Sequence, residues 1–284
     1  MRILITADEL ATIRRTRSDV RVLDVRWKLG GPPGLGEYRS GHIPGAVYVD
    51  LETELAGHGG PADGRHPLPT RSALQATARR WGLCDGDTVV VYDDLGGMSA
   101  ARAWWLLRHA GVRDVLLLDG ALAAWRAAGL PLVTESETGA GAETVRPGTI
   151  TLSEGVLPVL DTDAAASLAQ TGALLDARAA ERYRGDSEPI DPRAGHIPGA
   201  ISAPTADNLS IDGRFRPAAE LRDRFEALGV AVDAAAGTVG VYCGSGVTAA
   251  HTAAALTIAG FAPALYPGSW SQWSNLPGRP VETG

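Results

Sequence analysis

The chain has 284 residues, which is too long for one average domain and a natural length for two. Hydrophobic residues make up 45% and charged residues 21%, as in ordinary soluble proteins, and the 35 glycines and 18 prolines follow no period, which excludes collagen. The net charge of −7 without a basic run argues against nucleic acid or an anionic membrane surface as partners, and no apolar run is long enough to span a membrane.

The N-terminus and the cysteine content bear on the compartment. Residues 1–9 turn polar too soon for a signal peptide. Two cysteines, Cys84 and Cys243, are too few for a disulfide framework or a cysteine zinc site. We therefore expect a cytoplasmic protein in a reducing setting, without a metal centre.

Helix and strand signals alternate along the chain. In the first half we expect helices, opened by Thr6 and Thr70 as caps or closed by glycine, at residues 6–15, 70–81 and 99–109, and strands at 20–25, 46–49, 88–92 and 115–118. In the second half we expect strands at 174–176, 238–242 and 264–266 and helices at 218–228 and 247–259. Strands separated by helices predict an α/β fold with parallel sheets that carry helices on both faces.

The sequence repeats itself once. Ser-Gly-His-Ile-Pro-Gly-Ala at residues 40–46 recurs as Ala-Gly-His-Ile-Pro-Gly-Ala at 194–200, and an Asp-x-Arg triplet precedes each copy. A strand that ends in tyrosine and a Gly-x4-Trp pair follow each copy in the same order. We therefore expect two copies of one domain, at residues 1–134 and 150–284, joined by a linker at 135–149 that is poor in large apolar residues.

The repeat also separates structural residues from chemical ones. The histidines, Asp-x-Arg pairs and tryptophans present in both halves are expected to serve the fold; they are His42 and His196, Asp24–Arg26 and Asp176–Arg178, and Trp125 and Trp273. Cys243 behaves differently, because its counterpart in the first half is Asp93. A residue type found in only one half is a candidate for chemistry.

Cys243 lies in a glycine-rich turn between a strand and a helix, Tyr-Cys-Gly-Ser-Gly-Val-Thr at residues 242–248. The carboxyl ends of parallel strands are where α/β sheets bind ligands, and the N-terminus of a helix stabilises a thiolate. Backbone N–H groups around Gly244, Gly246, Val247 and Thr248, with the hydroxyl of Ser245, would hold a small anion there. Cys84 precedes a turn, has no match in the second half, and is expected to be inert.

Cysteine phosphatases share this strand–loop–helix arrangement, but they need an arginine six residues after the cysteine to clamp phosphate. Position 249 is alanine, which argues against phosphoryl chemistry. A persulfide carrier needs only the thiolate and the N–H groups of the loop.

On these motifs the chain resembles the tandem-domain rhodanese sulfurtransferases along nearly its whole length. The Cys-Gly-Ser-Gly-Val-Thr loop is similar to that of 3-mercaptopyruvate sulfurtransferases, whereas thiosulfate-type rhodaneses carry basic residues directly after the cysteine. The resemblance implies a non-catalytic N-terminal domain, a catalytic C-terminal domain, an active site between them and no cofactor. It also implies that Arg182, with Arg193 as a second candidate, binds substrate, and that Asp50, His66 and Ser245 relay a proton.

The leading hypothesis is an enzyme that takes sulfur from 3-mercaptopyruvate, a small anionic donor, onto Cys243. It then passes the sulfur to cyanide, a thiol or thioredoxin and releases pyruvate. One alternative is a thiosulfate:cyanide sulfurtransferase, in which Arg182 binds thiosulfate. Another is a carrier module whose persulfide is delivered by a partner protein. The sequence leaves the physiological donor, the acceptor and the oligomeric state open.

Overall fold

The computed structural model describes residues 2–134, 145–231 and 237–284 and divides into two compact units. The first unit consists of residues 1–56, 69–156 and 211–214, and the second of residues 57–68, 157–210 and 215–284. Of the expected linker, residues 135–144 lie outside the described residues, whereas residues 145–156 belong to the first unit.

Residues 57–68, which we expected in the first domain, belong to the second unit. Two hydrogen bonds to a C-terminal helix explain this. The Gln272 side-chain amide donates to the Ala62 carbonyl at 2.9 Å, and the Arg65 backbone N–H donates to the Ser271 hydroxyl at 3.0 Å. These residues lie more than 200 positions apart in the sequence, so no local pattern could reveal the connection.

The first unit is built on a five-stranded parallel sheet in the order β1-β5-β4-β2-β3. The strands run β1 Leu4–Ile5, β2 Val20–Asp24, β3 Ala46–Tyr48, β4 Thr88–Tyr92 and β5 Val115–Leu118. Four of them confirm the predicted strands to within a residue; β1 is too short to have been recognised. Side chains alternate between the two faces of such strands, and every residue of β4 is buried, as expected for a strand covered on both faces.

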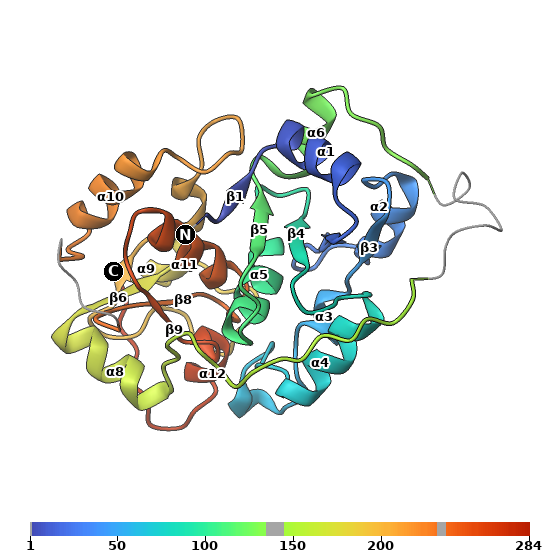
Figure 1. Ribbon diagram of the computed structural model, residues 1–284. Coiled ribbons are helices and arrows are strands. Elements are labelled where there is room, and N and C mark those ends of the chain that lie inside the picture. Colours follow the sequence, from blue (N-terminus) through green and yellow to red (C-terminus); the bar gives the residue numbers. More distant parts are fainter. Residues whose placement is uncertain (1, 135–144, 232–236) are drawn as a thin grey trace. The chain divides into compact units, whose positions relative to one another are not determined.

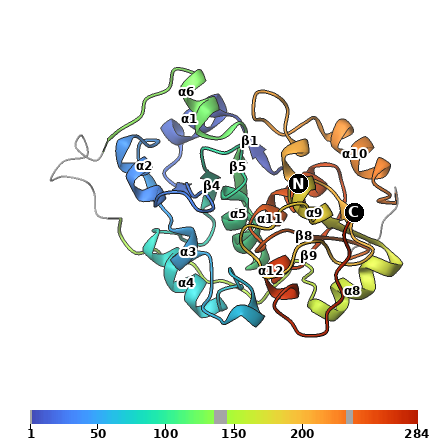
Figure 2. The same ribbon diagram turned by 180° about the vertical axis from the view of Figure 1, so that it is seen from behind.

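Helices cover this sheet. They run α1 Ala7–Thr16, α2 Gly34–Ser40, α3 Leu51–Glu54, α4 Arg71–Arg80, α5 Ala100–His109 and α6 Ala121–Ala127. The capping box of Thr6 and the cap of Thr70 are present, so α1 and α4 begin where the sequence predicted. Figures 1 and 2 both show α1 beside α6, where Leu10 and Trp125 share a core with Val90 and Leu116 of the sheet.

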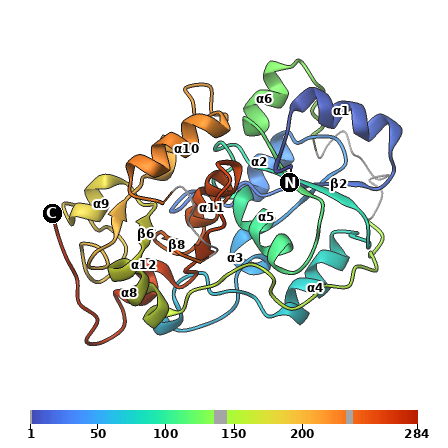
Figure 3. The same cartoon turned by 60° about the vertical axis from the view of Figure 1, so that its left-hand side comes forward.

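The second unit repeats this plan with a four-stranded parallel sheet in the order β7-β6-β8-β9. Its strands are β6 Ala173–Asp176, β7 Ile201–Ser202, β8 Val239–Tyr242 and β9 Ala264–Leu265. Its helices are α8 Thr162–Thr171, α9 Ala180–Arg184, α10 Ala218–Ala227, α11 Thr248–Ile258 and α12 Ser269–Trp273, and α10 packs beside α11 (Figure 3). A single parallel bridge between Val159 and Leu265 takes the place of β1.

The histidines shared by both halves serve the fold, as expected. His42 stacks on Tyr38 with 3.8 Å between ring centres, and His196 stacks on Tyr183 at 3.7 Å. Nδ1 of each histidine bonds the carbonyl of the same tyrosine, at 2.9 and 2.8 Å. The two histidines therefore close equivalent turns.

Among the described residues, no helix combines the length and the apolar character that crossing a membrane requires.

Candidate active site

The cysteine loop, residues 243–247, connects β8 to α11 in the second unit. Cys243 is buried, and the backbone N–H of Gly246 donates to its Sγ at 3.1 Å. Gly246 has φ +77°, a left-handed conformation that glycine adopts without strain and that turns its N–H back toward the sulfur. Val247 caps α11 and Thr248 is its first residue, so the positive end of this helix faces the loop.

The short helix α12 fixes the backbone of this loop through three hydrogen bonds. The Cys243 N–H donates to the Ser269 hydroxyl at 3.1 Å, and the Trp270 N–H donates to the Cys243 carbonyl at 2.9 Å. The Ser271 N–H donates to the Gly244 carbonyl, also at 2.9 Å. The nucleophile candidate therefore sits on a backbone that is held from the far end of the unit's sequence.

The equivalent loop of the first unit shows what this geometry binds. The Asp93 carboxylate is fully buried and accepts hydrogen bonds from the backbone N–H groups of residues 95, 97, 99 and 100, at 2.8–3.0 Å, and from the Ser99 hydroxyl. The fold thus surrounds an anion two bonds from Cβ with backbone donors. In the second unit the residue at this place is Cys243.

Arg182 of α9 lies against the cysteine loop. A Cβ added to Gly244 would be 3.4 Å from its Nη1, so the guanidinium stands directly over this glycine. Its Nη2 is held by Glu188 at 2.6 Å and by Asp191 at 3.3 Å. The structure therefore places the expected substrate-binding arginine beside the residue that follows the cysteine.

Arg65 is a second cation at the loop, and our sequence interpretation missed it. Its Nη2 lies 3.1 Å from the position of a Cβ on Gly244, and its Nη1 is paired with Asp191. The only local signal was that Arg65 directly precedes His66, a candidate catalytic residue. A side chain at position 244 would start 3.1 Å from Nη2 of Arg65 and 3.4 Å from Nη1 of Arg182, so it would crowd both guanidinium groups.

A chain of alternating charges supports both arginines. Arg178 pairs with Asp176 at 2.6 Å and with Glu188 at 3.3 Å. Glu188 also pairs with Arg182, and Arg182 pairs in turn with Asp191. Burial raises the pKa of Asp191 above its ordinary value, although the positive charge of Arg65 opposes this shift. The carboxylates hold the guanidinium groups in place through bonds that do not depend on any ligand.

Ser245 and His66 lie together in the second unit. Nδ1 of His66 and Oγ of Ser245 are 2.8 Å apart, and both residues are buried. Asp50 belongs to the first unit, where its Oδ1 caps α3 by accepting from the N–H groups of residues 52 and 53. Its part in a relay stays a prediction.

Arg193 has a different environment from the one expected of a substrate ligand. Its guanidinium donates to the backbone carbonyls of residues 273, 274, 276 and 279, at 2.6–3.3 Å. All three nitrogens are used in tying down the C-terminal segment. We therefore correct the assignment: Arg193 stabilises the fold, and Arg65 occupies the place beside Arg182 at the loop.

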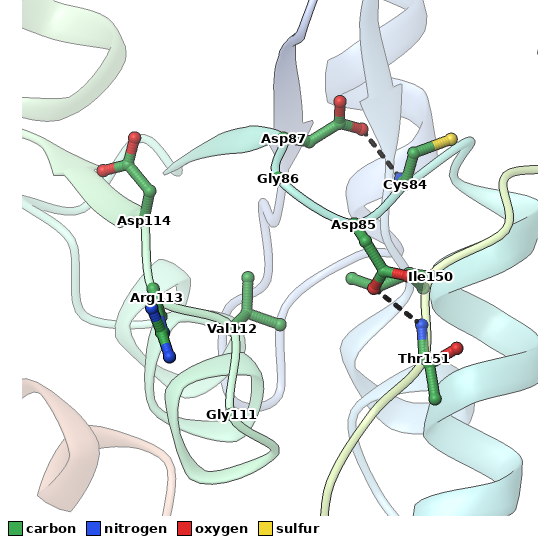
Figure 4. A pocket seen from close by; sticks show the side chains of 10 residues that line it. All are labelled: Cys84, Asp85, Gly86, Asp87, Gly111, Val112, Arg113, Asp114, Ile150 and Thr151. Carbon is green, nitrogen blue, oxygen red and sulfur yellow. Dashed lines mark hydrogen bonds between the residues drawn. The ribbon is translucent and has the colours of Figure 1, made fainter.

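The other cysteine lies in a pocket of about 280 Å³ in the first unit (Figure 4). The carboxylates of this pocket have structural partners: Asp87 accepts from the Cys84 N–H at 2.8 Å, and Asp85 accepts from the Thr151 N–H at 3.0 Å. Neither Cys84 nor Cys243 is in a disulfide. These contacts do not involve the Cys84 thiol, so its inertness stays a prediction.

Comparisons with known proteins give the same two-domain picture. The family model of the rhodanese-like domain matches residues 6–128 and 161–276. A probable 3-mercaptopyruvate sulfurtransferase of Pseudomonas aeruginosa is 49% identical, covering 99% of this chain and 98% of that protein. A putative thiosulfate sulfurtransferase of Mycobacterium tuberculosis is 46% identical, covering 99% of this chain and 97% of that protein.

The fold agrees with a solved relative. The crystal structure of the 3-mercaptopyruvate sulfotransferase SseA from Escherichia coli has a TM-score of 0.82 and 32% identity, covering 95% of this chain and 99% of that one. Two parallel sheets, two family matches and near-complete coverage of sulfurtransferase relatives lead to one conclusion. The chain belongs to the rhodanese family and is a sulfurtransferase with two rhodanese-like domains in tandem.

Proposed function

We propose that the protein moves sulfur from 3-mercaptopyruvate, through a persulfide on Cys243, to a thiophilic acceptor such as cyanide, a thiol or thioredoxin. The observation that carries the proposal is the surrounding of Cys243: two guanidinium groups stand over Gly244, and the Ser245 hydroxyl bonds to His66. The thiol of an α-keto acid has a carboxylate that suits the two guanidinium groups. Its leaving group needs a proton, which the Ser245–His66 pair can supply.

The first half-reaction forms one bond and breaks one. The Cys243 thiolate attacks the sulfur of the donor, an S–S bond forms, and the C–S bond breaks. The electron pair of that bond goes to the carbon of pyruvate as its enolate, which a proton then neutralises. The Ser245–His66 pair, with Nδ1 and Oγ 2.8 Å apart, is placed to deliver this proton.

The cysteine loop also suits the intermediate. In the corresponding turn of the first unit, backbone N–H groups bind the Asp93 carboxylate, whose oxygens lie two bonds from Cβ, as the outer sulfur of a Cys243 persulfide would. An acceptor then takes this sulfur and restores the thiolate. Two half-reactions joined by a covalent intermediate predict ping-pong kinetics.

Thiosulfate is the second candidate donor. The Mycobacterium tuberculosis relative carries that name, and two guanidinium groups also suit the oxygens of a thiosulfate dianion. Gly244 and Ser245, neither of them basic, favour 3-mercaptopyruvate over it.

Intact-mass measurement after brief exposure to each donor separates these candidates. We expect the wild-type protein to gain one sulfur atom from 3-mercaptopyruvate and the Cys243→Ser variant to gain none. Cys84→Ser is the matched control, because Cys84 is the other cysteine of the chain. This variant should gain one sulfur atom, as the wild type does.

A gain from thiosulfate alone would move the assignment to a thiosulfate sulfurtransferase. A gain from neither donor would leave a carrier that a partner protein charges, and a gain by Cys243→Ser would refute the persulfide site.

A further inference from the structure

One edge of the Arg65 guanidinium is unused at the cysteine loop, and we propose that this edge binds the carboxylate of the sulfur donor. The inference rests on the proposed function and names the second substrate anchor of the same site. It also assigns Arg182, which stands over the same glycine, to the neighbouring keto oxygen of the donor.

The hydrogen bonding of Arg65 leaves a matched pair of donors open. Its Nη1 is taken by Asp191, whereas Nε and Nη2 are buried and have no hydrogen-bond partner among the described residues. Nε and Nη2 lie on the same side of the planar guanidinium and point two N–H groups in parallel, which suits the two oxygens of a carboxylate. Charged donors left buried without a partner are costly, so an open pair of this kind indicates a ligand.

The same edge already binds carboxylates elsewhere in the chain. Arg26 holds Asp24 through Nε at 3.0 Å and Nη2 at 2.8 Å. Arg178 holds Asp176 through Nε at 3.0 Å and Nη2 at 2.6 Å. The open Nε/Nη2 edge of Arg65 therefore has the same pair of N–H donors as the edges of Arg26 and Arg178, which aspartates of the chain itself occupy.

The backbone fixes this edge relative to the nucleophile. The Arg65 N–H donates to the Ser271 hydroxyl at 3.0 Å, and the Ser271 N–H donates to the Gly244 carbonyl at 2.9 Å. One residue thus ties Arg65 to the position directly after Cys243. A donor that reacts at the Cys243 sulfur presents its far end, the carboxylate, to the guanidinium groups over Gly244.

Asp191 positions the two cations without filling the open edge. Its Oδ1 pairs with Nη1 of Arg65, and its Oδ2 lies 3.3 Å from Nη2 of Arg182. Nε of Arg182 is also buried without a partner among the described residues. The carboxylate of Asp191 therefore holds both guanidinium groups from one side and leaves a donor on each for the substrate.

The test compares donors with and without a carboxylate in the full-length protein. Mercaptoacetone has the thiol and the ketone of 3-mercaptopyruvate but a methyl group in place of the carboxylate. For Arg65→Gln we expect kcat/KM with 3-mercaptopyruvate to fall about 10- to 100-fold, the loss of a charge-assisted pair of hydrogen bonds. With mercaptoacetone it should change by less than about threefold.

Two further variants separate geometry from charge and from general damage. Arg65→Lys keeps the charge but has no planar edge, so it should lose most of the preference for 3-mercaptopyruvate as well. Arg279→Gln is the matched control, because Arg279 is as exposed as Arg65, at 28% against 26%, and also pairs with one aspartate. It should behave as the wild type with both donors.

An equal loss with both donors in Arg65→Gln, or full recovery in Arg65→Lys, would overturn the proposal. Calorimetry of pyruvate binding to the protein that carries no persulfide gives a measurement that does not depend on sulfur transfer. We expect Arg65→Gln to weaken it about tenfold or more. Unchanged pyruvate binding refutes the Arg65 edge, whereas a wild-type protein that binds pyruvate but takes no sulfur from 3-mercaptopyruvate refutes only the proposed function.

Discussion

Single residues decide which of the two equivalent loops can hold a sulfur atom. Asp93 fills its loop with a carboxylate that takes the backbone N–H groups for itself, at 2.8–3.0 Å. Cys243 leaves its loop with a small soft atom that can be extended by one more sulfur. The backbone donors of the first unit's loop are thereby occupied, because the Asp93 side chain is already bound there.

The loop of the first unit should depend on the charge of Asp93. We expect Asp93→Asn to lower the free energy of unfolding by about 2–4 kcal/mol, because an amide N–H₂ would face backbone donors in a buried site. Urea denaturation measures this loss. Asp94→Asn is the control: Asp94 pairs with Lys28 near the surface at 3.2 Å, so it should cost less than about 1 kcal/mol. Equal losses would contradict the special role of Asp93.

Among the secondary-structure elements, α12 positions the reactive loop although it is only five residues long. Ser269 begins this helix with φ +55°, an uncommon conformation for a residue with a side chain, and its hydroxyl accepts the Cys243 N–H. Ala121, the first residue of α6 in the first unit, has the same φ of +55°. Both units thus share this backbone turn at the start of the helix. Only the second unit has a serine there, and its hydroxyl accepts from the Cys243 N–H.

Two buried serines of this region make a matched pair. Ser269→Ala leaves the Cys243 N–H without its partner, so we expect a loss of about 1–3 kcal/mol of stability and slower persulfide formation. Ser274 has a buried hydroxyl without a partner among the described residues, so Ser274→Ala should be neutral or slightly stabilising. Thermal unfolding and single-turnover charging measure both. A Ser274→Ala variant as damaged as Ser269→Ala would show that the hydroxyl bond is not the cause.

Across the whole molecule, the repeat places a buried tyrosine at the end of each central strand. Burial raises the pKa of Tyr92 and of Tyr242 well above the usual value, and the neighbouring Asp24 and Asp176 add to the shift. Burial also raises the pKa of Tyr266 to about 12. All three phenols stay protonated in the folded chain at a pH at which an unfolded chain releases their protons.

Stability should therefore fall at alkaline pH. For a phenol whose folded pKa is raised, the contribution is complete below the unfolded value near pH 10 and is lost as pH rises through the folded value. For Tyr266 alone this amounts to about 3 kcal/mol between pH 10 and 12.

Urea denaturation at pH 9 to 12 measures this dependence. Tyr266→Phe should lose about 1 kcal/mol at neutral pH, with its hydrogen bond to Gln272, and show a shallower alkaline decline. An unchanged slope would argue against Tyr266 as a source of the decline.

Local patterns were enough for much of the fold. The strand at 88–92 and the caps at Thr6 and Thr70 were predicted because β-branched runs and capping residues act within a few positions. Helices α2, α3, α6, α8, α9 and α12 were not predicted. All of them except the ten-residue α8 have seven residues or fewer, which is too short to show a clear helical period. The internal repeat predicted two similar domains, because segments that share motifs in the same order and at similar spacing fold alike.

The sequence by itself determined the parallel α/β plan, its duplication and the singular position of Cys243, because each follows from local periodicity or from comparing one half with the other. Only the tertiary structure decided which arginine stands beside Arg182 at the cysteine loop. It assigned residues 57–68 to the second unit, set Arg65 over Gly244 and turned Arg193 toward the C-terminal carbonyls. Those contacts join residues about 80 to 200 positions apart, and such pairings depend on packing, which no local pattern encodes.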